Sequence, residues 1–131
     1  MNAKEAYLSK PWLKYYPEGV PEEVVPPAVS IPELFDQVAG KYASKAALIF
    51  YGNKISYAKL KELIDRFATA LADLGVKKGD KVAIWMGNKP EWVYANYACI
   101  KIGAPVVPLN TRYKAHELER ILRQSDSTTL F

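Results

Sequence analysis

Two stretches of the chain place apolar residues three and four positions apart, the spacing of an amphipathic helix. The first covers residues 31–42 and follows Ser30, whose hydroxyl can accept from the N–H of Glu33 while the Glu33 carboxylate reaches back. The second covers residues 57–74 and stops at Gly75, a residue suited to the left-handed end of a helix. The expected buried stripes are Ile31, Leu34, Phe35, Val38, Ala39 and Tyr42 in the first helix, and Leu60, Leu63, Ile64, Phe67, Leu71 and Leu74 in the second.

A short β-hairpin is predicted between these two helices. Residues 47–51 and 54–57 are rich in residues that favour strands, and Gly52-Asn53 between them suits a tight turn. Ser56, near the end of the second strand, can cap the helix that follows.

Beyond residue 79 the pattern changes to short apolar runs. Residues 82–86 and 104–109 are continuous apolar runs, which are typical of strands covered on both faces, and residues 128–131 begin a third. Helices are expected between the strands at residues 88–102, with Asn88 as N-cap and Gly103 as terminator, and at residues 115–124. Alternation of strand and helix predicts a parallel sheet. The fold class is therefore α/β: a small β-hairpin plus a βαβαβ parallel-sheet unit with helices on its faces.

Residues 1–29 are predicted to form an extended lead-in. They contain five of the nine prolines. Their aromatic side chains, Tyr7, Trp12, Tyr15 and Tyr16, are expected to pack on the chain's own domain. Residues 30–131 are expected to be a partial domain, because the chain stops as its last strand begins and leaves a parallel strand at an edge.

Composition narrows the function classes. The chain has 131 residues, of which 50% are hydrophobic and 24% charged, with a net charge of +4 that is scattered among acids. This pattern predicts a folded domain and no nucleic-acid partner. Lys101, Gly103 and two prolines interrupt the longest apolar stretch, so no transmembrane segment is expected, while peripheral membrane contact stays open. A single cysteine fits a cytoplasmic location.

No catalytic or metal-binding constellation is visible. The sequence has neither a G-x-x-x-x-G-K-[ST] loop nor a G-x-G-x-x-G motif after a strand. Cys99 lies within an expected helix among apolar neighbours, which indicates a buried structural thiol, and His116 is expected at the surface. One cysteine and one histidine are too few for a usual metal site.

Four consecutive segments resemble acyl- and aryl-CoA synthetases of the adenylate-forming enzyme family. These segments are Ile55–Leu63, Gly79–Asn88, Glu91–Ala104 and Pro105–Arg112. The lead-in segment Lys10–Pro21 further resembles the N-terminus of long- and medium-chain fatty acid members.

The resemblance implies that this chain is the N-terminal part of a fatty acid–CoA ligase. Such enzymes join a carboxylate to ATP, which gives an acyl-adenylate, and then transfer the acyl group to the thiol of CoA. The implied cofactors are ATP, Mg²⁺ and CoA, and the implied substrate is a fatty acid or other carboxylate. The family's phosphate-binding loop and catalytic lysine would lie after Phe131, so no catalytic residue is expected here. The chain alone is expected to be inactive and to bind no cofactor tightly.

The resemblance also points to one binding candidate. Asn110, Thr111 and Arg112 follow a predicted strand, at the end where α/β folds place ligands. In related synthetases this region approaches the CoA nucleotide, so these three residues are cofactor-side candidates.

Three alternatives remain open from the sequence. The chain can be part of an aryl-CoA ligase or a luciferase-like enzyme, or a non-catalytic α/β module that self-associates or binds a partner. It can also be a small nucleotide-binding protein of another family, which the missing phosphate loop disfavours. A homodimer is compatible with the ligase interpretations and with the non-catalytic module.

Overall fold

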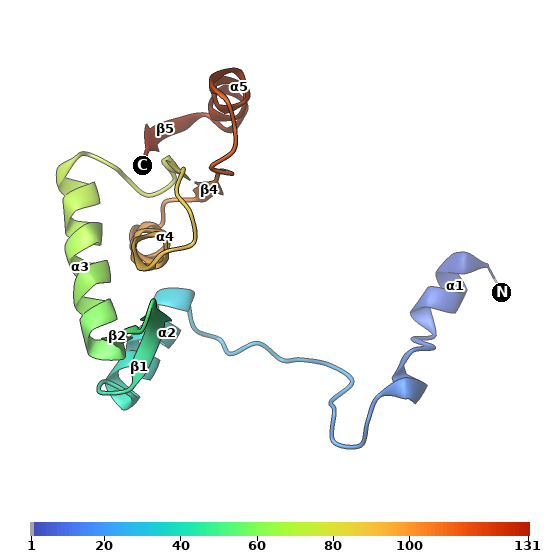
Figure 1. The fold of residues 1–131 in the computed structure, drawn as a ribbon. Coiled ribbons are helices and arrows are strands. Elements are labelled where there is room, and N and C mark those ends of the chain that lie inside the picture. The colour runs from blue at the N-terminus through green and yellow to red at the C-terminus, as the bar shows by residue number, and fades with distance from the viewer. Residues whose placement is uncertain (1) are drawn as a thin grey trace.

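The computed structural model describes residues 2–131 and shows an α/β domain with a lead-in that extends away from it (Figure 1). The lead-in contains helix α1 (Ala3–Leu8) and the 3₁₀ helix η1 (Leu13–Tyr15). The domain contains, in order, α2 (Ile31–Lys41), β1 (Ala46–Phe50), β2 (Asn53–Ser56), α3 (Tyr57–Asp73), β3 (Lys81–Ile84), α4 (Pro90–Ile102), β4 (Val106–Pro108), α5 (Ala115–Ser125) and β5 (Ser127–Leu130).

The second half of the domain is the predicted βαβαβ unit. Its three strands lie in the order β4-β3-β5, with β3 parallel to both neighbours. Helix α4 connects β3 to β4, and α5 connects β4 to β5. The α/β fold class with a separate two-stranded hairpin, β1-β2, is confirmed.

Both faces of the parallel sheet are covered, which explains the continuous apolar run of its central strand. Val82, Ala83 and Ile84 have no exposed surface. Val82 belongs to the main core, which it shares with residues of α3 and α4, whereas Ala83 packs with Leu118 of α5. Because successive side chains of a strand point to opposite faces, α3 and α4 cover one face and α5 the other.

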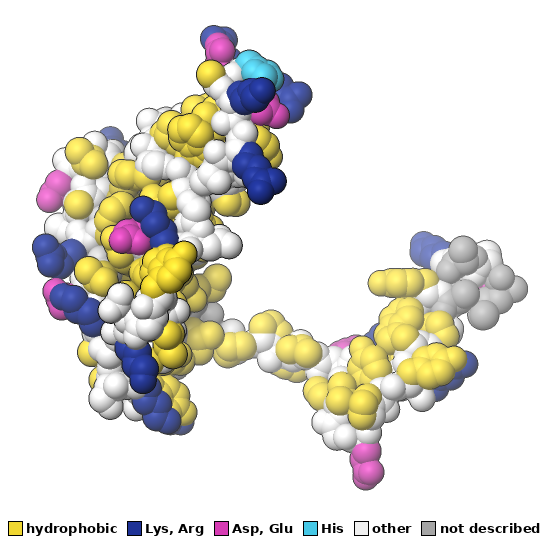
Figure 2. Space-filling view, viewed as in Figure 1, with side chains coloured by type: hydrophobic (Ala, Val, Ile, Leu, Met, Phe, Trp, Pro, Cys, Tyr) yellow, Lys and Arg dark blue, Asp and Glu magenta, His cyan; other side chains and the backbone are white. Residues whose placement is uncertain are grey.

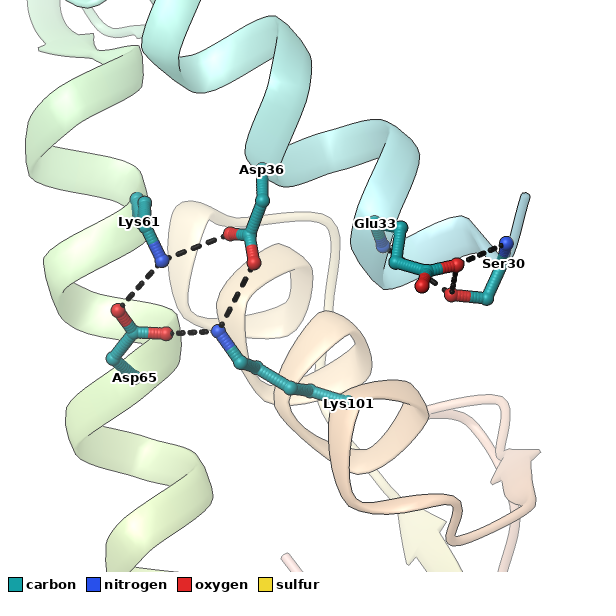
Figure 3. A network of polar contacts seen from close by, with 6 residues as sticks. All are labelled: Ser30, Glu33, Asp36, Lys61, Asp65 and Lys101. Carbon is teal, nitrogen blue, oxygen red and sulfur yellow. Dashed lines mark hydrogen bonds and ion pairs between the residues drawn. The ribbon is translucent and has the colours of Figure 1, made fainter.

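The predicted capping box at the start of α2 is confirmed. The Ser30 hydroxyl accepts from the Glu33 N–H, and the Glu33 carboxylate accepts from the Ser30 N–H at 2.8 Å (Figure 3). Ser56 caps α3 in the expected way, accepting from the Lys59 N–H at 3.2 Å. These bonds satisfy backbone donors that a helix start otherwise leaves without partners.

The hairpin turn lies one residue earlier than predicted. Phe50 pairs with Asn53, so the two turn residues are Tyr51 and Gly52 rather than Gly52 and Asn53. Both have positive φ, +46° and +81°, which a two-residue turn of the common hairpin type requires. Glycine at the second position makes this register the less strained one.

Three further predictions about the helices are wrong. Ile31 and Leu34, expected in the buried stripe of the first helix, are 56% and 42% exposed. Leu74 is 73% exposed, because α3 ends at Asp73 and Leu74 is already its cap. Asn88 does not cap α4: the helix begins at Pro90, and the cap is therefore Lys89. Proline favours the first helical position, where it needs no N–H partner, and this sets the helix start two residues after Asn88.

The lead-in departs from its prediction in two ways. It contains α1 and η1 and is therefore not extended throughout. It also runs away from the domain (Figure 1), and none of its aromatic residues belongs to the core clusters. Tyr7 instead stacks against Trp12, with ring centroids 5.1 Å apart. The prolines of residues 17–29 favour an extended backbone, which carries α1 away from α2.

Four alternating charges connect the three helices α2, α3 and α4 (Figure 3). Lys61 of α3 pairs with Asp36 of α2 at 2.8 Å and with Asp65 at 2.9 Å. Lys101 of α4 pairs with the same two carboxylates. Each charge thus has two partners of opposite sign, and hydrogen bonds to Asp36 and Asp65 raise the pKa of Lys61.

Among the described residues, no helix combines the length and the apolar character needed to cross a membrane.

The core predicts a sharp contrast between two leucines of the α3 region. Leu71→Ala should destabilise the domain by about 2–5 kcal/mol, because Leu71 is fully buried and its removal leaves a cavity. Leu74→Ala is the matched control and should cost less than about 0.5 kcal/mol, since Leu74 is exposed. Urea unfolding followed by circular dichroism measures both, and equal losses would contradict this packing.

The charge network predicts a pH-dependent contribution from Asp65. Burial raises the pKa of Asp65, but hydrogen bonds from Lys101 and Lys61 outweigh it and leave this pKa below its ordinary value. The stabilisation is therefore complete above the unfolded-state pKa, about 3.9, and is lost as the pH falls through the folded-state value. Asp65→Asn should lower stability by about 1 kcal/mol at pH 7, a modest value because the carboxylate is partly exposed.

Urea unfolding of wild type and Asp65→Asn between pH 7 and pH 3 tests this contribution. The difference between the two proteins should shrink below about pH 4. A difference that stays constant over this range would show that the charge of Asp65 does not stabilise the helices.

Candidate functional site

A groove lies at the carboxyl ends of β3 and β4 and has a volume of about 530 Å³. One wall comes from the segment after β3 and from α4, and the other from the end of β4 and the turn that follows. The lining residues are Met86, Gly87, Asn88, Trp92, Pro108, Leu109, Asn110, Thr111 and Tyr113. In open α/β sheets, ligands bind beyond the carboxyl ends of the strands, so this groove is the candidate site.

The turn after β4 is held by hydrogen bonds that centre on Asn110. Its side-chain Oδ1 accepts from the Arg112 N–H at 2.9 Å, and its carbonyl accepts from the Tyr113 N–H at 3.0 Å. The same carbonyl accepts from the Trp85 indole N–H at 2.9 Å, which connects the turn to the end of β3. Asparagine favours such turns because its side chain can bond the backbone two residues later.

The structure brings two of the three predicted candidates into the groove. Asn110 and Thr111 line it, while Arg112 is exposed and is not among the lining residues. Asn110 also has a structural role, because its side chain already bonds the Arg112 N–H. Thr111 lines the groove beside Asn110, and Arg112 supplies a positive charge directly next to it in sequence.

Sequence reasoning missed the other wall of the groove. Met86, Gly87 and Asn88 follow β3 just as Asn110 and Thr111 follow β4. The carboxyl ends of parallel strands meet at one edge of a sheet, and this rule would have joined the two segments. Asn88 was instead interpreted as a helix cap, although the start of α4 at Pro90 leaves its side chain beside the groove.

The lining suits binding better than bond-breaking chemistry. It offers two amides, the hydroxyls of Thr111 and Tyr113 and two aromatic rings, and none of its side chains is a carboxylate, an imidazole or a thiol. Lys89, Arg112 and Lys114 stand next to the lining segments in sequence and add positive charge. Amides, aromatic faces and nearby cations are the groups that hold a nucleotide or another polar anion.

Cys99 and His116 play no part in this groove. Cys99 is fully buried in α4, and burial raises the pKa of its thiol to about 11, so the reactive thiolate is disfavoured at neutral pH. His116 is exposed in the first turn of α5. The expectations of a structural cysteine and a surface histidine are both confirmed.

The hydrogen bonds of the turn predict a local effect at residue 110. Asn110→Ala removes the acceptor of the Arg112 N–H and should speed amide hydrogen exchange at Arg112 by roughly fivefold, the equivalent of about 1 kcal/mol. Asn110→Asp keeps an oxygen in place and should preserve slow exchange. Residue-resolved exchange by NMR measures both, and equal rates in the two variants would contradict the assigned role.

The structure resembles solved enzymes of known class. It superposes on the N-terminal subdomain of Klebsiella oxytoca NpsA in complex with 3-hydroxyanthranilyl-AMSN, with a TM-score of 0.75 and 32% identity over 77% of this chain and 26% of that one. It also superposes on the O-succinylbenzoate coenzyme A synthetase MenE of Bacillus subtilis in complex with AMP. That match has a TM-score of 0.71 and 36% identity over 73% of this chain and 25% of the other.

Sequence comparison agrees with the structural one. The chain is 36% identical over 125 residues to the long-chain-fatty-acid–CoA ligase of Salmonella typhimurium, which covers 94% of this chain and 22% of the ligase. It thus spans about a fifth of the length of the curated relatives it matches. Residues 35–131 match the sequence profile of the AMP-binding enzyme family. The relatives of this chain include acyl- and aryl-CoA synthetases, and the chain itself belongs to the AMP-binding enzyme family.

Proposed function

We propose that the chain is the N-terminal part of an ATP-dependent fatty acid–CoA ligase. The observation that carries this proposal is the 36% identity to a long-chain-fatty-acid–CoA ligase, which extends over 94% of the chain and therefore includes most of the lead-in. The reaction has two steps. The carboxylate displaces pyrophosphate from ATP to give an acyl-adenylate, and the CoA thiol then displaces AMP.

The groove at the carboxyl edge of the sheet is the part of this chain that we assign to the ligase reaction. Its amides and aromatic rings, with Arg112 and Lys114 nearby, fit the nucleotide end of CoA. Thr111 can bond a phosphate or ribose oxygen, and Arg112 can pair with phosphate. In this assignment Asn110, Thr111 and Arg112 all serve to bind CoA and take no part in the chemical steps.

ATP and Mg²⁺ need other residues. The family holds the triphosphate with a Gly/Ser/Thr-rich loop and a lysine, and the sequence of this chain contains no such loop. We therefore assign triphosphate binding and both chemical steps to residues outside this chain. By itself the chain should be inactive and should bind ATP only weakly.

A second candidate is an aryl-CoA ligase. The observation that favours it is the 36% identity to an O-succinylbenzoate coenzyme A synthetase, although that match covers 73% of the chain rather than 94%. The two candidates share the CoA groove and differ in the acid, which this groove does not select.

A chimaera tests whether this chain can serve as the N-terminal part of such a ligase. In it, this chain replaces the matching 125 residues of the Salmonella ligase. It should form acyl-CoA from long-chain fatty acids with ATP. Arg112→Ala in this chimaera should raise the KM for CoA by roughly tenfold and leave the KM for ATP unchanged, the effect expected for one lost phosphate contact of about 1–2 kcal/mol.

Arg123→Ala is the control, because Arg123 is an exposed arginine of α5 that pairs with Glu119 away from the groove. It should change neither KM. Thermal unfolding confirms that each chimaera is folded before the assay. A folded chimaera with no activity on any acid would overturn the ligase proposal, and an Arg112 effect on ATP alone would overturn the assignment of the groove to CoA.

A further inference from the structure

The lead-in carries a disproportionate share of the exposed apolar surface. It makes up about a fifth of the chain, yet half of the large hydrophobic side chains that the described structure leaves exposed belong to it. Those residues are Tyr7, Leu8, Tyr15, Tyr16, Val20, Val24, Val25 and Val29. Figure 2 shows hydrophobic side chains over much of the visible face of this segment. Exposed apolar patches of this kind mark interaction sites.

The charges of the lead-in are separated along its length. Residues 2–16, here called the head, carry three lysines and one glutamate: Lys4, Lys10, Lys14 and Glu5. Residues 17–29, here called the tether, carry three glutamates and no lysine or arginine. The head is therefore positive and the tether negative, although the chain as a whole is only weakly basic.

The head is also the aromatic part of the lead-in. Tyr7 and Tyr15 are 70% and 76% exposed, and the Tyr7 ring stacks on Trp12. The Lys14 ammonium lies 4.9 Å from the centre of the Tyr15 ring, so a cation and a ring stand side by side. Tyrosine, tryptophan and lysine are the residues that favour the boundary between lipid headgroups and acyl chains, since each combines an apolar body with a polar end.

The tether can place the head far from the domain. Four prolines in 13 residues favour an extended backbone, which spans up to about 40 Å at roughly 3.1 Å per residue. One exposed ion pair, between Lys10 and Glu23 at 2.8 Å, holds the tether against the head. Exposed pairs contribute little, so lipid phosphates can replace Glu23 as the partner of Lys10.

We propose that residues 2–16 are an interfacial anchor that binds the surface of an anionic lipid membrane. The aromatic rings insert at the headgroup level, and Lys4, Lys10 and Lys14 pair with lipid phosphates. The tether, whose glutamates are repelled by the same phosphates, holds the α/β domain off the surface. This inference goes beyond the ligase proposal, because it is argued from apolar surface and charge and not from the groove.

Charge favours lipid over a second copy of the chain as the occupant. Ile49 and Phe50 line a second groove and, with Tyr51, are exposed apolar residues of the β1-β2 hairpin. This hairpin carries Lys54 and directly follows Lys45. A positive head would be repelled by that positive surface, whereas an anionic membrane attracts it by about 1 kcal/mol for each lysine.

Vesicle flotation of the full chain tests the anchor, because aggregates sink and only lipid-bound protein rises. The probe is a vesicle of phosphatidylcholine with about 30% anionic phosphatidylglycerol, and vesicles of pure phosphatidylcholine are the comparison. The chain should float with the anionic vesicles, and raising the salt concentration should release it. A triple variant, Tyr7→Ser with Trp12→Ser and Tyr15→Ser, should bind these vesicles at least roughly tenfold more weakly than the wild type.

Two further variants make the result specific. Lys4→Glu with Lys14→Glu should also lose roughly tenfold or more, and Ile49→Ser with Tyr51→Ser, which removes exposed apolar groups of the domain, should bind as wild type does. All three should keep the wild-type unfolding temperature, since none of these side chains belongs to the core. Absence of flotation, or equal flotation of the head variants, would overturn the proposal. Dimers that require the head and form without lipid, seen by light scattering, would instead assign the head to a second copy.

Discussion

The structure depends on the complete burial of one short strand. Val82, Ala83 and Ile84 of β3 have no exposed surface, because β4 and β5 pair with both edges and helices cover both faces. A strand in this position must be apolar throughout and must lie parallel to neighbours that return through helices. The order of the elements from β3 to β5 follows from that constraint, and so does the alignment of the carboxyl ends of β3 and β4.

The candidate groove is a consequence of that alignment. Where β3 and β4 end, the chain turns away on each side, and the Trp85 indole bonds the Asn110 carbonyl to hold the two turns together. Polar side chains gather there because the sheet no longer buries them. A separate set of contacts lies among the helices. The charged network of Asp36, Lys61, Asp65 and Lys101 holds α2 and α3 against α4. The lead-in takes part in neither, which leaves it available for contact with another surface.

Local signals predicted most of the elements, and tertiary contacts account for what they missed. The Ser30–Glu33 capping box and the apolar run at Val82 depend only on neighbours in sequence, and both predictions are confirmed. Asn88 failed as a cap because Pro90 competes for the helix start. One partner of Asp65, Lys101, lies 36 residues away in sequence on another helix, so no local pattern indicates that pair. Asn110 and Thr111 of the groove were found through a resemblance. Met86, Gly87 and Asn88 on the opposite wall could be found only by knowing which strands lie side by side.

The central claim is the proposal that this domain is part of an acyl-CoA-forming ligase, in which residues outside this chain supply the phosphate-binding loop and the catalytic lysine. The most direct measurement is to sequence the source gene past the codon for Phe131. The account predicts that the reading frame continues into a Gly/Ser/Thr-rich loop with a lysine, the group needed to hold a triphosphate. An immediate stop codon, or a continuing frame without such a loop, would contradict it and leave a binding module in place of a ligase.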